Sequence, residues 1–245
     1  MMHRLVESYR TALNLVAPER WLTRRFIRRH LAARLSPSGA CIDLGGGNAP
    51  FRPVLSAVRP AARHIVVDRV AGDCTDVAAD AHRLPFASGR ADVVAMFQVV
   101  QFFDHPAAAL AECRRVLHSD GLLLMTYPFM TSEGRSHDLR RWSTRGMEIE
   151  LKAAGFEPVA HETLGGPCFF VTATLSGLPG RLLIAHRQGW RTGRSAADAF
   201  RLGLAFGLSL PFHFLGFPAS WLDRAVRRPA HYLGGIVLAR KLSDA

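Results

Sequence analysis

Three consecutive glycines, Gly45–Gly47, follow a short apolar run that ends with Asp43 and Leu44. A second apolar run, HIVV, ends at another carboxylate, Asp68. Glycine lets the backbone approach a ligand closely, and an open α/β sheet binds its ligands at the carboxyl ends of its strands. A carboxylate that ends the second strand is placed to accept hydrogen bonds from ribose hydroxyls. These residues predict a nucleotide-binding site for a cofactor that contains adenosine.

The glycine run departs from the dinucleotide-binding pattern. G-x-G-x-x-G requires a third spaced glycine, but Asn48, Ala49 and Pro50 follow Gly47. This disfavours a nicotinamide-dependent dehydrogenase and favours a wider loop around one nucleoside with a short charged tail. Glycines that merely permit a tight strand–helix turn remain an alternative.

The surrounding sequence alternates short apolar runs with helical patterns, which predicts a parallel sheet covered on both faces. A tight turn is expected at 119–121, and the run YLGGIVLARK predicts a last strand that returns antiparallel beside its predecessor. The earlier strands are expected at 40–44, 64–67, 76–79, 91–97, 122–127 and 156–161, and the helices at 50–58, 106–117 and 144–154.

Charge is unevenly distributed over the 245 residues, which carry a formal net charge of +11. Arginines cluster between 20 and 34 and again between 181 and 228, and such clusters attract phosphate on nucleic acid, anionic lipid or a sugar nucleotide. A GC-rich genome would also favour arginine. No signal peptide is visible, and the cysteines form no C-x-x-C pair, so we expect reduced thiols in a cytoplasmic protein without a metal.

A late segment is strongly apolar. Residues 163–180 and 202–222 contain no charged side chain, and the second stretch is long enough to suggest a membrane span. Pro211 and Pro218 instead predict two short helices broken at Pro211. A membrane hairpin would also export the arginine-rich residues 186–198, against the positive-inside rule. We expect an insertion that lies on the membrane, covers an apolar substrate or forms an oligomer interface. Burial in the protein's own core stays open.

From Cys41 to about Gly166 the chain resembles the class I S-adenosylmethionine-dependent methyltransferases, in particular the methyltransferase type 11-like subgroup that modifies small molecules, quinones, lipids and sugars. Four segments match in order: CIDLGGGNAP, IVVD, AADAHRLPFASGRADVV and PAAALAECRRVLHSDGLLLMTYPF. The resemblance implies S-adenosylmethionine as cofactor. The backbone of the glycine run and the carboxylate of Asp43 would hold the methionine part of the cofactor. Asp68 would bind the ribose and Asp80 the adenine. The residues at the end of the fourth strand would lie beside the sulfonium. The implied residues are Asp43, Gly45, Gly46, Gly47, Asp68, Asp80, Ala81, Phe97 and Gln98.

Two segments bear on the acceptor. FQVVQFF replaces the Asn/Asp-Pro-Pro-aromatic segment of nucleobase N-methyltransferases, so no nucleic-acid partner is expected. The segment SHDLRRWS resembles a D-x-x-R-aromatic-S/T segment in methyltransferases of glycan synthesis. It implies that Asp138, Arg141 and Trp142 contact the substrate, although Asp138 and Arg141 could equally form a salt bridge that fixes the segment.

A hydroxyl nucleophile benefits from a base that titrates near neutral pH, so histidine is the natural candidate. His137 is the first choice, followed by His105 and Glu133. We expect O-methylation of a lipid, a lipid-linked glycan, a sugar or another small molecule. A methyltransferase of a soluble secondary metabolite and a non-catalytic binding or assembly protein on the same fold are the alternatives.

Together these observations predict an α/β fold with a Rossmann-like, seven-stranded, mostly parallel sheet and helices on both faces. Residues 1–37 form an N-terminal helical cap, 38–165 the cofactor-binding core, 166–228 the apolar helical insertion and 229–245 the final strand. The apolar stripe from Trp21 to Leu31 favours a cap over the cofactor site rather than a helix on lipid. The protein is expected in the cytoplasm or peripherally on the inner membrane face, and an oligomer is compatible with the sequence.

Overall fold

The computed structural model describes residues 18–32, 34, 38–131, 137–184, 196–223 and 231–242. The chain divides into two compact units, which are described separately. The sheet unit comprises 23–164 and 233–245, and the hairpin unit comprises 1–22 and 165–232.

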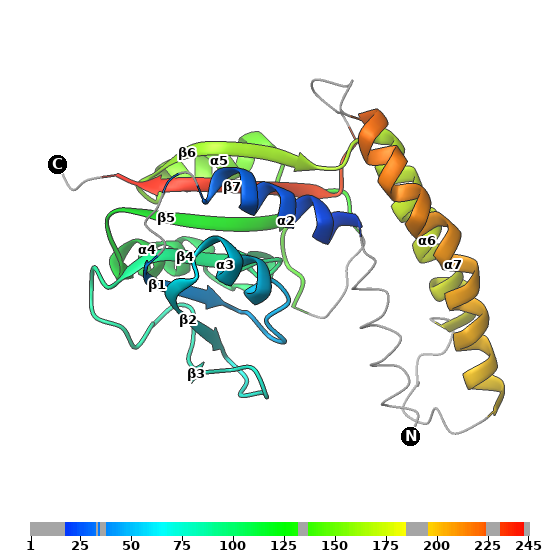
Figure 1. The fold of residues 1–245 in the computed structure, drawn as a ribbon, viewed down its shortest axis with the longest axis horizontal. Coiled ribbons are helices and arrows are strands. Elements are labelled where there is room, and N and C mark those ends of the chain that lie inside the picture. The colour runs from blue at the N-terminus through cyan, green and yellow to red at the C-terminus, as the bar shows by residue number, and fades with distance from the viewer. Residues whose placement is uncertain are drawn as a thin grey trace. The chain divides into compact units, whose positions relative to one another are not determined.

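The sheet unit is built on one seven-stranded sheet with the order β3-β2-β1-β4-β5-β7-β6 (Figure 1). The first five strands pair in parallel, and β7 pairs antiparallel with both β5 and β6. The prediction of a Rossmann-like, mostly parallel seven-stranded sheet is therefore confirmed. The strands are β1 (Ser38–Leu44), β2 (Ala61–Asp68), β3 (Val77–Ala78), β4 (Ala91–Phe97), β5 (Leu117–Pro128), β6 (Phe156–Leu164) and β7 (Gly234–Lys241).

Helices cover both faces of this sheet. Figure 1 shows α2 and α3 in front of the strands and α4 and α5 behind them. The inner residues of α4 and α5 join one buried apolar cluster with β1, β4 and β5. On α2, Phe26 and Ile27 are buried, as is Leu31 just beyond its end, so this stripe packs on its own unit. The helices are α2 (Pro18–His30), α3 (Arg52–Val58), α4 (Pro106–Val116) and α5 (Thr144–Ala153), with a short 3₁₀ helix η1 (Val100–Phe102) after β4.

One strand begins earlier than predicted. The turn expected at 119–121 lies inside β5, where the pairing jumps from Leu117 opposite Ala91 to Leu122 opposite Val93. The intervening residues bulge out of the ladder with β4, and Asp120 has a φ of 65°. Leu117 is held in place because its carbonyl accepts a hydrogen bond from Lys241 Nζ at 2.8 Å.

The hairpin unit contains two long helices that pack along each other, α6 (Pro167–Ile184) and α7 (Ala196–Leu222) (Figure 1). The prediction of two short helices broken at Pro211 is wrong, because α7 continues through Pro211 and Pro218. A proline removes one backbone donor from a helix, and packing against a neighbouring helix can hold the helix together across that gap. Within the described residues, none of the helices combines the length and hydropathy required to cross a bilayer.

A buried carboxylate joins the start of α6 to the end of α7. Asp223 accepts hydrogen bonds from the backbone N–H groups of Gly166 at 2.9 Å, Cys168 at 2.9 Å and Phe169 at 2.8 Å. The first N–H groups of a helix have no partner within the helix and carry a partial positive charge, so a carboxylate is well suited to this position. The contact fixes how the two helices meet at this end.

Candidate cofactor and acceptor site

The register of the sheet brings three sequence-predicted segments to one edge. Leu44 of β1 lies opposite Val67 of β2, and Asp43 lies opposite Ala95 of β4. Because these strands are parallel, the glycine run, Asp68 and the residues after Phe97 all lie at the carboxyl edge of the sheet. This is the edge at which open α/β sheets bind ligands.

The glycine run turns across the end of β2. The N–H groups of Gly45 and Gly46 donate to the carbonyl of Val67 at 2.7 and 3.3 Å. Gly45 has a φ of +68°, and a Cβ atom there would lie 2.3 Å from Cγ2 of Val99. Any residue with a side chain at position 45 would therefore strain the backbone and push the loop away from the segment after β4.

Asp68 holds the far side of this loop. Its carboxylate accepts one hydrogen bond from the N–H of Gly47 at 3.1 Å and one from the N–H of Val70 at 3.1 Å. No atom lies within 4 Å of the position that a Cβ atom of Gly47 would take, so the loop is open on that side. The two carboxylate oxygens still have lone pairs to accept hydrogen bonds from ribose hydroxyls.

Asp43 is a buried carboxylate without a partner. Its side chain lies beneath the glycine run, the residue is only 4% exposed, and neither carboxylate oxygen has a hydrogen-bond partner. Burial raises its pKa to about 7, the positive charge of Arg52 opposes this shift, and the negative charge of Asp68 adds to it. Buried polar groups are nearly always paired, so this carboxylate is suited to a cationic ligand group. The ammonium of S-adenosylmethionine fits that requirement.

Asp80, which the resemblance assigns to adenine, lies just beyond β3. Its carboxylate is hydrogen-bonded to the backbone N–H of His82 at 2.8 Å and to the His82 ring Nδ1 at 2.6 Å. These bonds, led by the backbone one, lower the pKa of Asp80, so it is an ionised acceptor. Ala81 is buried beside it. The other ring nitrogen of His82, Nε2, is buried without a partner, and the ring packs edge-on against Phe103.

An ion pair on α4 holds the loop that carries Asp80. Glu112 accepts a hydrogen bond from the N–H of Leu84 at 2.8 Å, while Arg115 donates to the carbonyls of Leu84 at 3.0 Å and Phe86 at 2.8 Å. Glu112 and Arg115 also pair with each other, and this pairing lowers the pKa of Glu112. Both residues lie in the matching segment PAAALAECRRVLHSDGLLLMTYPF, but no role was predicted for them. The structure shows that they hold the loop that follows Asp80.

The end of β4 carries the residues predicted to flank the sulfonium. The ring of Phe97 packs on that of Phe51, with 4.2 Å between ring centroids. Gln98 is exposed with a φ of 54°, and its N–H donates to Thr126 Oγ1 at 2.9 Å. Gln101 is buried on η1, where its Nε2 donates to the carbonyl of Gln98 at 2.9 Å and its Oε1 has no partner. Gln101 belongs to the segment FQVVQFF, from which no role was predicted for it.

The segment after β5 is tied to the same region. Leu139 donates its N–H to the carbonyl of Gln101 at 3.0 Å. Asp138 and Arg141 form a two-pronged ion pair, whose Nη2 to Oδ2 distance is 2.8 Å, and the Asp138 side chain is almost fully buried. Trp142 is buried in the core cluster behind the sheet. The geometry of Asp138 and Arg141 is that of a salt bridge fixing the segment.

Two of the three candidate bases lie within the described residues. His137 is exposed and directly precedes the ion-paired Asp138. His105 is exposed at the start of α4, with its ring 6.2 Å from that of His82 between centroids. Glu133 lies outside the described residues. Histidine and cysteine side chains in the described part of the chain form no metal-binding cluster with carboxylates. Burial raises the pKa of the Cys41 and Cys113 thiols to about 12, so both thiols stay protonated at neutral pH.

Comparison with known proteins agrees with this geometry. Residues 42–125 match a family described as a methyltransferase domain. A sarcosine dimethylglycine methyltransferase homologue from Galdieria sulphuraria is 13% identical with a TM-score of 0.57, covering 96% of this chain and 98% of its own. A 1,6-didemethyltoxoflavin N1-methyltransferase from Burkholderia thailandensis, solved with S-adenosylhomocysteine, is 14% identical with a TM-score of 0.56, covering 98% and 87%.

The same fold also occurs with other chemistry. The cyclase SpnF is 20% identical with a TM-score of 0.54, covering 92% of this chain and 81% of its own. No curated protein matches the sequence. The matched domain contains the glycine run, Asp68, Asp80 and the Glu112–Arg115 pair, and the orphaned carboxylate of Asp43 fits the cofactor's ammonium. Residues 42–125 therefore match a methyltransferase domain, and the chain shares the fold of solved S-adenosylmethionine-dependent methyltransferases.

Proposed function

We propose that this methyltransferase modifies a hydroxyl oxygen of a lipid, a lipid-linked glycan, a sugar or another small molecule. The observation that carries the proposal is the buried amide of Gln101, which lies between the end of β4 and the segment 137–142 and has no partner for its Oε1. An amide oxygen can accept the hydrogen bond of a substrate hydroxyl. The sequence also lacks the Asn/Asp-Pro-Pro-aromatic segment that would suit a nucleobase amine.

Bound S-adenosylmethionine supplies a methyl group that is already activated for in-line displacement. The chain's own task is to position the reactants and to exclude water. Asp43 would neutralise the cofactor's ammonium, Asp68 would accept from its ribose hydroxyls and Asp80 from its adenine amino group. On the acceptor side, Gln101 would orient the hydroxyl and His137 would take up its proton, because imidazole is the side chain suited to accept a proton near neutral pH.

Two alternatives have support of their own. The first is that a soluble secondary metabolite is the acceptor, in which case the apolar segment would line a pocket for it. A non-catalytic binding or assembly protein on this fold is the second alternative, because a fold alone does not fix a reaction: the cyclase SpnF shares this one.

Calorimetry with S-adenosylmethionine is the first test. The wild-type protein should bind the cofactor, and Asp68→Ala should abolish binding because it removes the carboxylate that holds Gly47 and faces the ribose. Asp73→Ala, in an exposed loop, is the matched control and should bind normally. Tight binding by Asp68→Ala would contradict the site assignment.

Transfer itself is tested with cofactor that carries a deuterated methyl group. Separate lipid and polar extracts are incubated with the enzyme, and mass spectrometry locates the label. Label in an ether of a lipid, glycan or sugar supports the proposal, and label on nitrogen contradicts it. His137→Ala should lower kcat without changing the Kd for S-adenosylmethionine, whereas His118→Ala, beside Asp92 and away from the site, should leave both unchanged.

A further inference from the structure

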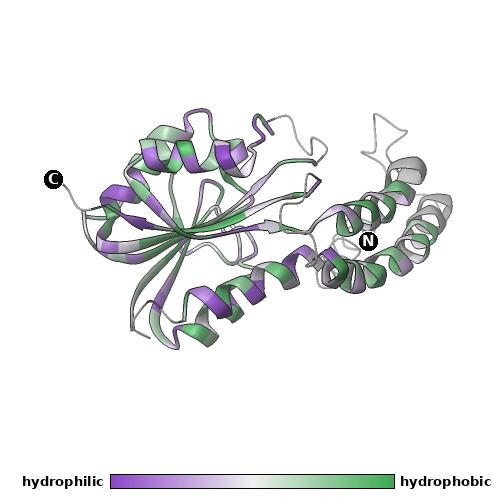
Figure 2. Ribbon diagram, turned by 90° about the horizontal axis from the view of Figure 1, so that it is seen from above, coloured by the Kyte–Doolittle hydropathy of each residue, from purple (hydrophilic) through white to green (hydrophobic). Residues whose placement is uncertain are grey.

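The hairpin unit exposes large apolar side chains along α7. Phe214 is 60% exposed, Leu215 51% and Trp221 64%. Leu204, Leu208 and Leu222 are exposed as well, so the stripe extends over most of the helix. Figure 2 shows the described parts of α6 and α7 as largely hydrophobic. Contiguous apolar surface of this kind marks an interaction site.

The buried face of α7 carries small residues instead. Ala205, Ser209, Gly216, Ala219 and Ser220 are all buried, and α7 packs along α6. Helices of water-soluble proteins usually bury their large apolar residues and expose polar ones. The reverse arrangement, with small residues between helices and large apolar residues outside, is typical of helix pairs surrounded by lipid.

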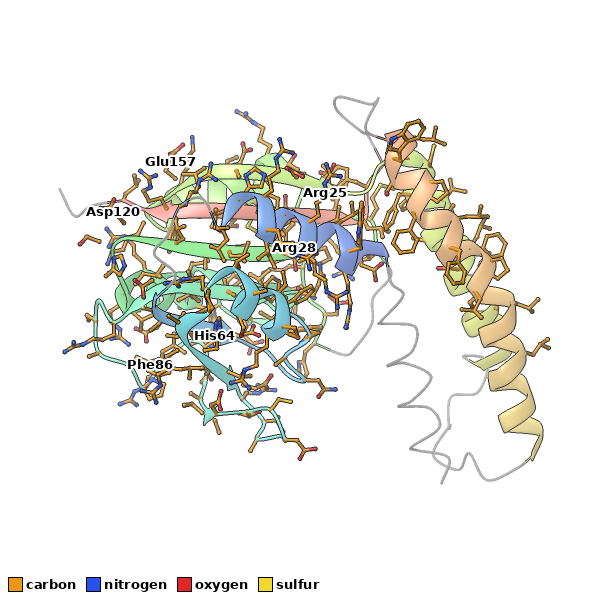
Figure 3. All side chains as sticks on the ribbon, viewed as in Figure 1. Arg25, Arg28, His64, Phe86, Asp120 and Glu157 are labelled. Carbon is orange, nitrogen blue, oxygen red and sulfur yellow. The ribbon has the colours of Figure 1, made fainter. Side chains whose placement is uncertain are left out.

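The polar groups of the two helices are also arranged for an apolar surrounding. Each of five hydroxyls donates to a backbone carbonyl three or four residues earlier in its own helix: Thr172, Thr174, Ser176, Ser209 and Ser220. This removes donors that would otherwise require water. None of the described side chains within α6 and α7 is charged. Figure 3 accordingly shows mostly carbon on these helices.

Positive charge flanks α7 on both sides along the chain. Arg191 and Arg194 precede it by a few residues, and Arg224, Arg227 and Arg228 follow it directly. Anionic lipid headgroups attract basic residues that adjoin an apolar segment in the sequence. A second copy of the chain would bring a like-charged surface instead, since the net charge is +11.

We propose that the hairpin unit docks on an anionic lipid bilayer. The outward stripe of α7 lies at the boundary between headgroups and acyl chains. The docking goes beyond methyl transfer, because it concerns a surface of the hairpin unit. It does not depend on which molecule accepts the methyl group.

Co-sedimentation with phosphatidylcholine vesicles, with and without phosphatidylglycerol, tests the docking. The full chain should bind vesicles containing phosphatidylglycerol, and added salt should weaken binding because it screens the arginines. The triple variant Phe214→Ser, Leu215→Ser, Trp221→Ser should lower the partition constant by at least about tenfold, because it removes three side chains that would enter the bilayer.

The matched control is Ile149→Ser, which changes an exposed apolar residue of the sheet unit and should bind vesicles like the wild type. Binding of S-adenosylmethionine by every variant shows that the sheet unit is folded and tests the proposed cofactor site separately. Two results would overturn the docking proposal: a folded wild-type protein that stays in the supernatant with anionic vesicles, or unchanged vesicle binding by the triple variant. A lipid-free dimer that the triple variant abolishes would also overturn it and identify a second copy as the occupant.

Discussion

Replacing Asp43 by asparagine should stabilise the cofactor-free protein while weakening cofactor binding. Both oxygens of the Asp43 carboxylate are buried without a partner, and its pKa rises from 3.8 to about 7. Asparagine has nearly the same shape and no charge to desolvate. The variant therefore escapes the cost of an ionised buried group.

The stability difference between Asp43→Asn and the wild type follows from the raised pKa of Asp43 and increases with pH. In the unfolded chain the carboxyl group ionises near 3.8, whereas in the folded protein it keeps its proton up to about 7. Between these values the folded state binds more protons, so the wild type loses stability as pH rises through this window. Raising the pKa from 3.8 to about 7 corresponds to a destabilisation of roughly 4 kcal/mol once the group is fully ionised. The advantage of Asp43→Asn should be near zero below pH 4 and approach this value above pH 8.

Urea unfolding followed by circular dichroism measures the effect, at about pH 5, about pH 7 and about pH 8.5. Asp73→Asn, which neutralises an exposed carboxyl, is the control and should show no comparable trend. Calorimetry should show weaker binding of S-adenosylmethionine by Asp43→Asn, because the counter-charge for its ammonium is gone. A stability difference that does not change with pH would refute the reasoning, since it would mean that Asp43 has a charged partner in the free protein.

Three other substitutions test the packing around the site and the hairpin. Gly235→Ala should lower the free energy of unfolding by roughly 3 kcal/mol in urea titration, because its Cβ would lie 2.2 Å from Oη of Tyr127. Asp223→Ala leaves three N–H groups at the start of α6 without their acceptor, and it should speed limited proteolysis of the hairpin unit by destabilising it by about 1–3 kcal/mol. Glu112→Gln should lower stability at neutral pH and converge with the wild type in acid, because the lowered pKa of Glu112 makes its contribution present above its ordinary titration range and lost as pH falls.

The Gly235→Ala prediction has a matched control, and the other two have outcomes that would contradict them. Gly207→Ala adds a methyl group to a helical position with no atom within 4 Å, so it should be neutral or stabilise by up to about 1 kcal/mol. Losses of equal size at Gly235 and Gly207 would show that glycine substitution in general, and not the clash with Tyr127, is responsible. Unchanged proteolysis of Asp223→Ala would mean that water replaces the carboxylate. A Glu112→Gln difference that persists in acid would mean that shape, and not charge, matters there.

The sheet could be predicted well because its strands are short apolar runs between clear turn signals. β4 has the predicted bounds, Ala91–Phe97. All of its residues except Asp92 and Phe97 are buried, which is why the strand stands out as an apolar run. The helical insertion could not be predicted in the same way. Pro211 is a local signal for a break, but the packing of α7 along α6 decides the outcome. Local propensity is a weak prior where tertiary contacts compensate for a missing hydrogen bond.

Part of the candidate site could also be predicted from the sequence. Asp43, Asp68 and Asp80 each follow or end an apolar run, and parallel pairing places their strand ends together. The Glu112 contact with Leu84 and the orphaned Oε1 of Gln101 could not be foreseen. Both depend on the path of loops between distant segments, and no spacing along the chain records that path.

The join between β6 and β7 has a consequence for how such a protein can change. Leu164, the last residue of β6, is paired with Gly234, the first of β7, and the N–H of Leu233 donates to the carbonyl of Leu164 at 3.3 Å. Residues 165–232, the larger part of the hairpin unit, thus occupy the position of the loop between two neighbouring antiparallel strands. Material can be gained, lost or exchanged there without altering the strand register on either side. The sheet edge that carries the glycine run, Asp43 and Asp68 can therefore stay unchanged while the segment between β6 and β7 varies.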